Sequence, residues 1–306
     1  TEEKDAAFLK LYDGHDWKWF AVRLKHTDME YLRKHWSGKK ASVPMLEKKH
    51  DKYFLRFTYA EEVALNRTPV KEQTICSVDL GINTDAVCTI MRPDGTILGR
   101  KFINFPSDKD RMYRVLGRIR RFQREHGSRQ VQGRWAYAKR LNTELGKKIA
   151  REIVFYASEN RADVIVFEYL EMKGKLSGKK KQKLQMWRKR DIQKRCGQQA
   201  HRKGIRISRI CAWNTSRLAF DGSGKIDRDI QDHRLCTFQN GKRYNCDLSA
   251  SYNIGARYFI REILKPLPAT ERSLLEAKVP AVKRRTSCVY ADLRELISEM
   301  ELRKAA

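Results

Sequence analysis

The sequence predicts an α/β protein built on a mixed β-sheet, and three groups of residues support this prediction. Residues 75–80 and 163–167 are short apolar runs rich in β-branched side chains, which are typical of buried strands. Residues 111–124 and 130–160 predict long basic helices, the second with apolar side chains at helical spacing. Residues 247–263 predict a further helix. Strands alternating with helices indicate a sheet that has helices on both faces.

A small β-rich domain is predicted ahead of the sheet, over residues 1–73. Residues 17–25 alternate in part and residues 52–59 are rich in aromatic side chains, so both segments predict strands. Residues 28–35 between them predict a short helix. We expect the aromatic side chains to pack in the core of this domain rather than to stack on bases.

The order of elements after residue 74 is that of an RNase H-like domain. Strands are predicted at 75–80, 86–91, 96–103, 163–167 and 205–213, and helices at 111–124, 130–160, 188–203 and 247–263. In that layout the first strand is central, and the end of the fourth strand lies beside it. The predicted nuclease-like domain comprises residues 74–213 and 247–265, with an insertion at residues 214–246.

A helical tail is predicted for residues 266–306. The segment Lys265-Pro266-Leu267-Pro268 leads us to expect that the chain leaves the core at this point. An amphipathic stripe in the tail should nevertheless dock somewhere. The stripe is formed by Val289, Leu293, Leu296, Ile297 and Met300.

The charge of the chain favours a nucleic-acid partner. With 65 Lys and Arg against 37 Asp and Glu, the formal net charge is +28. No apolar stretch is long enough to span a bilayer, so we expect no membrane partner. The seven cysteines are scattered, which excludes a disulfide framework and indicates a reducing, intracellular compartment. We therefore expect a cytoplasmic protein of prokaryotic type.

Three acidic residues carry the predicted chemistry. Asp79 and Glu168 each end an apolar strand, and Asp247 opens the last helix of the domain. Hydrolysis of a phosphodiester needs an activated water and a neutralised leaving oxygen, which two Mg²⁺ ions about 4 Å apart can supply. Such hard cations prefer carboxylate oxygens, and Mn²⁺ is an alternative. Taken singly, each acid has a structural interpretation, such as a turn residue or a helix cap for Asp247.

The motifs around these acids resemble those of one protein family. Asp79-Leu-Gly-Ile-Asn, Phe167-Glu-Tyr-Leu and Asp247-Leu-Ser-Ala-Ser-Tyr-Asn-Ile are similar to the three RuvC motifs of transposon-encoded TnpB proteins and compact type V CRISPR effectors. Trp187 and the segment Trp213-Asn214-Thr215-Ser216 extend the resemblance, and the first region resembles the wedge domain of that family.

The resemblance implies an RNA-guided DNA endonuclease with guide RNA and target DNA as partners. Asp79, Glu168 and Asp247 would be its catalytic metal ligands. Basic side chains would lie along the nucleic-acid path and make binding depend steeply on salt. These predicted contacts are Arg118, Arg120, Arg121, Arg124, Lys179, Lys180, Lys181, Arg188 and Arg190.

The insertion departs from the zinc ribbon of that family, which carries paired C-x-x-C arms. Ala219 and Gly222 stand where the first pair would fall, and Gln239 follows Cys236 in the second arm. His233 with Cys236 is a weak metal motif. We therefore expect a degenerate ribbon without zinc.

The first region is also too short for the helical recognition lobe of the family. Either that lobe lies outside this sequence, or a second copy or partner subunit supplies it. Two other functions stay open: an RNA-guided DNA-binding protein or repressor with weak or no cleavage, and a RuvC-like resolvase or transposase that acts without RNA. The intact set of three acids argues against the first of these.

Overall fold

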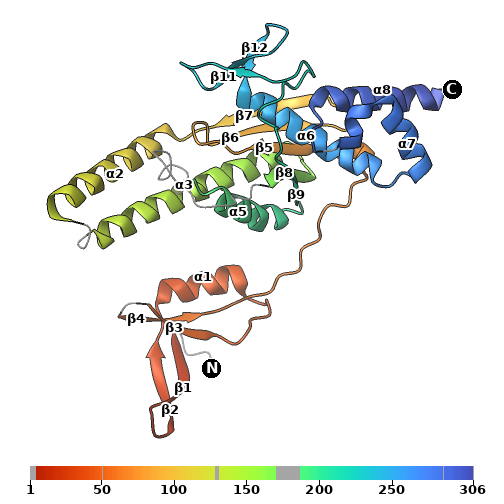
Figure 1. Cartoon of the computed structure of the whole chain (residues 1–306). Coiled ribbons are helices and arrows are strands. Elements are labelled where there is room, and N and C mark those ends of the chain that lie inside the picture. The colour runs from red at the N-terminus through yellow and green to blue at the C-terminus, as the bar shows by residue number, and fades with distance from the viewer. Residues whose placement is uncertain (1–4, 50, 128–130, 170–186, 285, 306) are drawn as a thin grey trace. The chain divides into compact units, whose positions relative to one another are not determined.

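The computed structural model describes residues 5–49, 51–127, 131–169, 187–284 and 286–305 (Figure 1). The chain divides into two compact units, Thr1–Val63 and Ala64–Ala306. The sequence-based boundary at residue 73 lies within the second unit. The reason is a set of hydrogen bonds, because the Thr74 N–H donates to Asp163 at 2.9 Å and the Thr68 hydroxyl donates to it at 2.5 Å.

The first unit consists of two β-hairpins and a helix. Strands β1 (Ala6–Tyr12) and β2 (Trp17–Arg23) pair antiparallel, as do β3 (Met45–Lys49) and β4 (Lys52–Arg56). Helix α1 (His26–Trp36) lies between the hairpins in sequence. No described residue of this unit is buried. The expected aromatic core is therefore wrong, because two separate two-stranded sheets give the aromatic side chains no enclosed interior.

A mixed five-stranded sheet organises the second unit, as the sequence predicts. Its order is β7-β6-β5-β8-β9. The strands are β5 (Ile75–Asp79), β6 (Ala86–Met91), β7 (Ile97–Ile103), β8 (Val164–Tyr169) and β9 (Arg206–Cys211). Strand β5 is central and pairs antiparallel with β6 but parallel with β8. Every residue of β5 and β6 is buried, which explains their continuous apolar runs.

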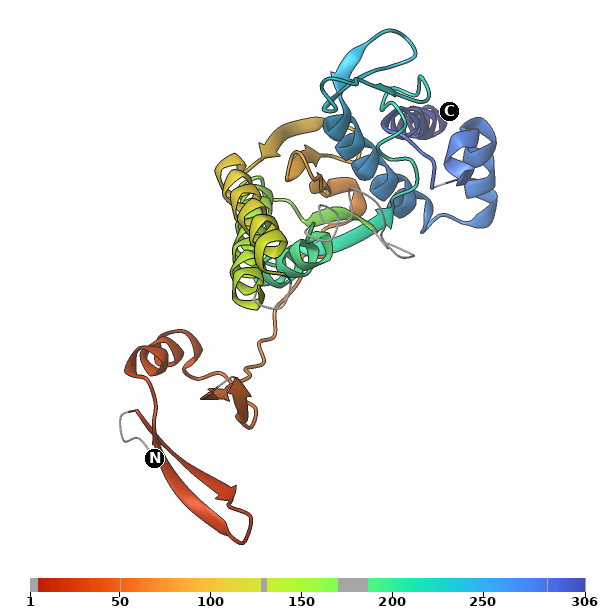
Figure 2. The same cartoon turned by 60° about the vertical axis from the view of Figure 1, so that its left-hand side comes forward.

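Helices cover the two faces of the sheet (Figures 1 and 2). A hydrophobic cluster lies between the sheet and the helices on each face. On one face, Cys76 and Val78 pack with Ile149 and Ile153 of helix α3 (Gln132–Glu159). Helix α5 (Lys189–His201) joins this layer, and α2 (Pro106–His126) forms a hairpin with α3. On the other face, Ile75 packs against α6 (Cys246–Leu264).

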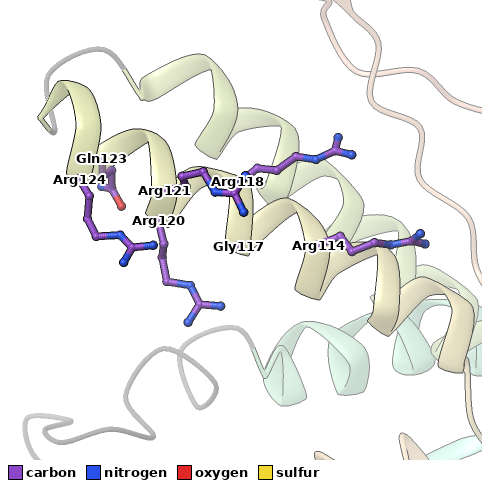
Figure 3. Close-up of a pocket in the computed structure, with 7 residues that line it drawn as sticks. All are labelled: Arg114, Gly117, Arg118, Arg120, Arg121, Gln123 and Arg124. Carbon is purple, nitrogen blue, oxygen red and sulfur yellow. The ribbon is translucent and has the colours of Figure 1, made fainter.

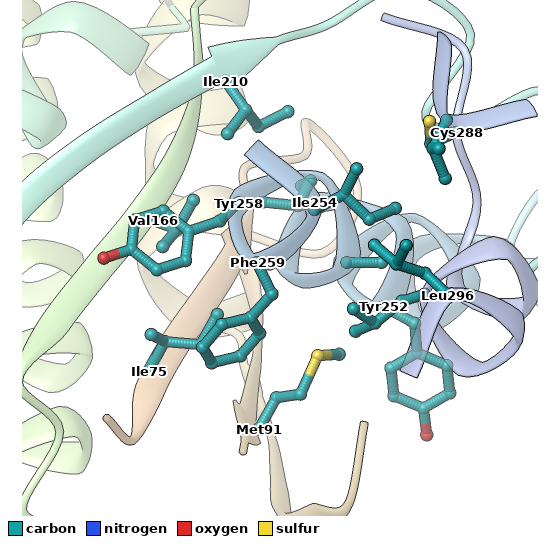
Figure 4. Close-up of a cluster of buried hydrophobic side chains, with 14 of the residues drawn as sticks. Ile75, Met91, Val166, Ile210, Tyr252, Ile254, Tyr258, Phe259, Cys288 and Leu296 are labelled. Atoms are coloured by element: carbon teal, nitrogen blue, oxygen red, sulfur yellow. The ribbon is translucent and has the colours of Figure 1, made fainter. Parts of the chain in front are cut away.

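The tail belongs to the same core, contrary to the expectation that it leaves it. The short helix η1 (Val70–Glu72) precedes the sheet, and α7 (Ala269–Lys278), η2 (Pro280–Arg284) and α8 (Tyr290–Ala305) follow α6. Cys288 and Leu296 join the cluster around α6 (Figure 4). Of the predicted stripe, Leu293 and Leu296 are fully buried. The proline segment ends α6 and begins α7, so it marks a turn at the surface of the same unit.

The insertion forms a small three-stranded sheet of β10 (Asp227–Arg228), β11 (Leu235–Thr237) and β12 (Arg243–Asn245). It leads directly into α6, so it lies next to the first turn of that helix (Figure 1). Among the described residues, no helix is long and apolar enough to cross a membrane.

Candidate active site

The register of the sheet brings the predicted acids together. Val78 of β5 lies opposite Phe167 of β8, so the following residues, Asp79 and Glu168, lie side by side where the two parallel strands end. Asp247 stands in the first turn of α6, which packs on β5. All three acids line one pocket of about 370 Å³.

The environment of each acid is distinct. Asp79 and Glu168 are each only 8% exposed, and Asp247 is half-buried. The N-cap of α6 is Asn245, whose side-chain oxygen accepts a hydrogen bond from the Leu248 N–H at 2.9 Å. Because Asn245 already caps the helix, the interpretation of Asp247 as a structural cap is wrong. The Asp247 carboxylate still lies at the positive end of the helix dipole.

Burial and mutual repulsion raise the pKa of the acids. The pKa of Asp79 lies well above its ordinary value, first because of burial and then because Glu168 and Asp247 are close. Burial is also the main cause of the raised pKa of Glu168 and of Asp247. Three carboxyls that resist ionisation together form a site that a cation would stabilise.

Two threonine hydroxyls hold the outer acids. The buried Thr215 donates a hydrogen bond to Glu168, and a hydrogen bond from the Thr84 side chain lowers the pKa of Asp247. Within the described residues, no three His, Cys, Asp or Glu side chains already form a set that could hold a metal ion. The donor set of three carboxylates nevertheless suits a hard divalent cation.

A cationic side chain from the insertion reaches the acids, and no pattern in the sequence indicates it. Arg228 of β10 lines the pocket and lowers the pKa of both Asp79 and Asp247. Its guanidinium donates to the Ser216 carbonyl at 3.0 Å. His233 and Arg234 line the same pocket. The insertion thus places positive charge where a phosphate would meet the carboxylates.

Two buried cations, Lys189 and Arg257, act electrostatically on Glu168, and sequence analysis missed both. Lys189 is 8% exposed, and burial is the main cause of its lowered pKa. The Arg257 guanidinium donates to the carbonyls of Cys211 at 2.9 Å and Trp213 at 2.7 Å. Both cations lower the pKa of Glu168. Basic side chains in helices are too common here for sequence alone to single out these two.

The four predicted arginines of α2 lie together. Arg118, Arg120, Arg121 and Arg124 line a hollow of about 860 Å³, which Arg114 completes (Figure 3). Arg120 and Arg124 extend to one side of the helix, and Arg114 and Arg118 extend to another (Figure 3). We call this surface the arginine hollow.

The remaining predicted contacts are scattered. Arg188 donates to Thr143 and pairs with Asp191 at 3.2 Å, an acid that Arg195 also contacts at 2.8 Å. Arg190 is exposed on α5. Lys179, Lys180 and Lys181 lie outside the described residues.

Apolar packing holds the insertion together at the positions of the ribbon arms. Ala219, Cys236, Phe238 and Cys246 form a buried cluster. The Cys236 thiol donates to the Tyr244 carbonyl at 3.4 Å, and burial raises the pKa of that thiol to about 12. A thiol that resists ionisation is a poor zinc ligand. The expected absence of zinc stays a prediction.

Comparisons with known proteins give structural neighbours only. No protein-family model and no curated protein match the chain. The chain is similar to the Cas12f1-sgRNA-target DNA complex, with a TM-score of 0.49 and 18% identity over 68% of this chain and 54% of that one. For the CRISPR-Cas12f ternary complex the TM-score is 0.45 at 16% identity, over 76% and 49% of the two chains.

The structural neighbours are CRISPR effector complexes. A Cas12i-crRNA-dsDNA complex gives a TM-score of 0.44 at 10% identity, over 97% of this chain and 52% of that chain. The chain spans about half the length of these solved structures. This structural similarity is too weak to transfer a function to the chain. A function is therefore inferred from the residues of the chain itself.

Proposed function

We propose that the chain is an RNA-guided DNA endonuclease with a RuvC-like site formed by Asp79, Glu168 and Asp247. The convergence of these three carboxylates in one pocket carries the proposal. The sheet order supports the RuvC-like assignment, because the acids come from the central strand, its parallel neighbour and the last helix of an RNase H-like layout.

The carboxylates would hold two Mg²⁺ ions, or Mn²⁺, which supply an activated water and charge neutralisation at the leaving oxygen. Asp79 is the central ligand, because both other acids act on its pKa. Glu168 and Asp247 complete the set from either side. Arg228 orients the phosphate, because its guanidinium already faces Asp79 and Asp247.

Guide RNA and target DNA are the partners that the surface favours. The formal net charge of +28 and the arginine hollow provide phosphate contacts that do not depend on sequence. Sequence recognition would then come from base pairing with the guide, as the family resemblance implies. A second copy or a partner subunit would supply further contacts with the guide RNA.

A second function, guided DNA binding with weak or no cleavage, is favoured by one observation. The Thr215 hydroxyl donates to Glu168 and the Thr84 side chain hydrogen-bonds to Asp247, so both outer acids already have partners. A protein that stays in this arrangement would bind its target without cutting it.

One experiment separates the candidates. The protein is purified, co-purifying RNA is sequenced, and matched DNA is incubated with Mg²⁺ or Mn²⁺. We expect cleavage that requires RNA and is lost in Asp79→Ala. The control is Glu152→Gln, which removes a half-buried acid of α3 that pairs with Lys101 at 2.9 Å and lies outside the carboxylate pocket.

Each result has a distinct meaning. RNA-dependent binding without cleavage by the parent protein supports the binding function. Cleavage without RNA overturns the guided mechanism in favour of a resolvase or transposase. Cleavage that survives Asp79→Ala overturns the site itself.

A further inference from the structure

A second pocket lies beside the carboxylates and has no role in the proposed hydrolysis. Its volume is about 560 Å³, within the range of pockets that enclose small organic ligands. It lies between the β5–β6 loop, the α2–α3 hairpin and the start of α5. Its wall is largely apolar and includes Met112, Leu116, Leu145, Ile149 and Ile192.

This apolar pocket connects the two charged sites. It shares Gly81, Ile82, Asn83 and Trp187 with the carboxylate pocket. At its other side it shares Arg120 with the arginine hollow. The three hollows therefore follow one another along the protein, from arginines through an apolar recess to the acids.

Trp187 forms the wall between the apolar pocket and the acids. Its indole Nε1 is buried and has no hydrogen-bond partner within the described part of the chain. A buried donor without a partner costs about 1–3 kcal/mol. The second aromatic side chain, Tyr113, is 71% exposed at the rim.

The charges of the pocket favour an uncharged planar ligand inside and a phosphate outside. Asp85 is neutralised by Lys109 at 3.0 Å and accepts a hydrogen bond from the Phe105 N–H at 2.8 Å. Arg188 pairs with Asp191 at 3.2 Å, and Arg195 shares this acid at 2.8 Å. The remaining charged lining residues, Asp110 and Arg120, are of opposite sign. The interior therefore has little net charge to hold a phosphate, whereas the arginine hollow has much.

We propose that the apolar pocket holds one unstacked nucleobase of the DNA strand that enters the carboxylate site. The backbone of this strand passes along Arg120, and its next phosphate reaches the acids. The Trp187 ring packs against the base and so sets which phosphate is presented for cleavage. This role rests on the proposed function and adds a subsite to it.

The test measures binding without cleavage, in a buffer that contains EDTA. The full-length protein with its co-purified RNA is titrated with a fluorescently labelled single-stranded oligodeoxynucleotide. One abasic site is placed at each position of the oligonucleotide in turn. Stacking of one base on an aromatic side chain is worth about 5- to 150-fold in affinity, so we expect such a loss at a single position.

Variants connect that position to the pocket. In Trp187→Ala the abasic site at this position should cause no further loss of affinity, because the side chain that contacts the base is already absent. Trp187→Phe keeps a ring and should give an intermediate loss. Leu116→Phe narrows the pocket without removing a wall and should reproduce the effect of Trp187→Ala. The control Phe155→Ala removes an aromatic side chain of α3 that is 50% exposed and lies outside the pocket.

Two results would overturn the subsite. One is an affinity that does not depend on abasic position, and the other is a position effect that persists unchanged in both Trp187→Ala and Leu116→Phe. Failure of the endonuclease is recognised separately, as absence of Mg²⁺-dependent cleavage by the parent protein. A position effect that depends on Trp187 supports the base pocket even in a protein that does not cut.

Discussion

The Thr215 hydroxyl donates a hydrogen bond to the Glu168 carboxylate, and this contact joins the segment after β9 to the end of β8. The Thr215 carbonyl in turn accepts from the Asn253 side chain at 3.0 Å. Asn253 lies on α6, the helix that also carries Asp247. One helix therefore positions two acids, Asp247 directly and Glu168 through Thr215.

Replacing Thr215 by valine should move the pH dependence of cleavage to higher pH. The hydroxyl lowers the pKa of Glu168, whereas burial raises it. Without the hydroxyl this pKa should rise further, so the acid ionises only at a higher pH. A metal ligand must be ionised, so activity at neutral pH should fall about tenfold and recover as the pH rises. Cleavage rates measured across a pH series test this expectation.

Thr215→Ser is the matched variant, because it keeps the hydroxyl and removes only a methyl group. It should retain the pH profile of the parent. If Thr215→Val and Thr215→Ser lose activity equally at every pH, Thr215 acts through packing and not through Glu168.

Replacing Asp79 by asparagine should stabilise the metal-free protein at neutral pH. The folded state binds a proton at Asp79 more tightly than the unfolded chain does, because its pKa is raised by burial and by its acidic neighbours. The free energy of unfolding therefore falls as the pH rises from the ordinary carboxyl pKa to the raised one. Each unit of difference between these two pKa values lowers it by about 1.4 kcal/mol. Asparagine removes this loss, and the melting temperature should rise.

Added Mg²⁺ should stabilise the parent protein more than the Asp79→Asn variant. An ion that binds only the folded state raises the melting temperature of the parent. It should raise that of Asp79→Asn much less, because a central ligand is missing. Thermal melts with and without Mg²⁺ measure both effects, and an equal Mg²⁺ shift in the two proteins would place the ion elsewhere.

Replacing Arg228 by glutamine should slow cleavage more than it weakens binding. Its guanidinium faces Asp79 and Asp247, where a scissile phosphate would lie, so a loss of about tenfold or more in the single-turnover rate is expected. Arg243→Gln is the control, because it removes the same charge from another strand of the same insertion sheet, outside the carboxylate pocket, where Arg243 pairs with Asp229 at 3.2 Å. If the two variants slow cleavage equally, the total positive charge of the insertion matters and not the position of Arg228.

The central sheet and its acids were predictable because burial leaves a simple pattern. Continuous apolar runs predicted β5 and β8, and their ends marked Asp79 and Glu168. Strands β1 and β3 escaped prediction, because none of their own residues is buried and charged residues interrupt their apolar runs. The proline segment after α6 misled the prediction of the tail, because a break in a helix looks the same in sequence whether the chain leaves the core or turns and continues in the same unit.

The surroundings of the acids depend on contacts between distant segments. Arg228, Lys189 and Arg257 act on the carboxylates from three separate elements. Nothing in a chain rich in basic residues distinguishes these three. Thr215 had a partial signal, because its segment resembles the one that precedes the ribbon in the TnpB family.

Truncating Leu293 should show that the tail stabilises the nuclease-like unit. This side chain of α8 is fully buried in the cluster around α6, so Leu293→Ala should cost about 2–5 kcal/mol. Leu302→Ala on the same helix is the control, because its side chain is 64% exposed and should cost little. Denaturant unfolding measures both. Equal small losses would mean that the tail docks without contributing to the core.

Neutralising the arginine hollow should reduce the salt dependence of DNA binding without changing the cleavage chemistry. For single-stranded DNA, each phosphate that the protein no longer neutralises lowers the slope of log affinity against log salt by about 0.7. The double variant Arg118→Gln/Arg121→Gln should therefore lower the slope by about 1.4 if both side chains bind phosphates. Arg284→Gln, which removes an exposed charge outside the hollow, is the control. Affinities measured over a salt series test whether the arginine hollow binds phosphates. If the double variant has the same slope as Arg284→Gln, the hollow is an ordinary solvated surface.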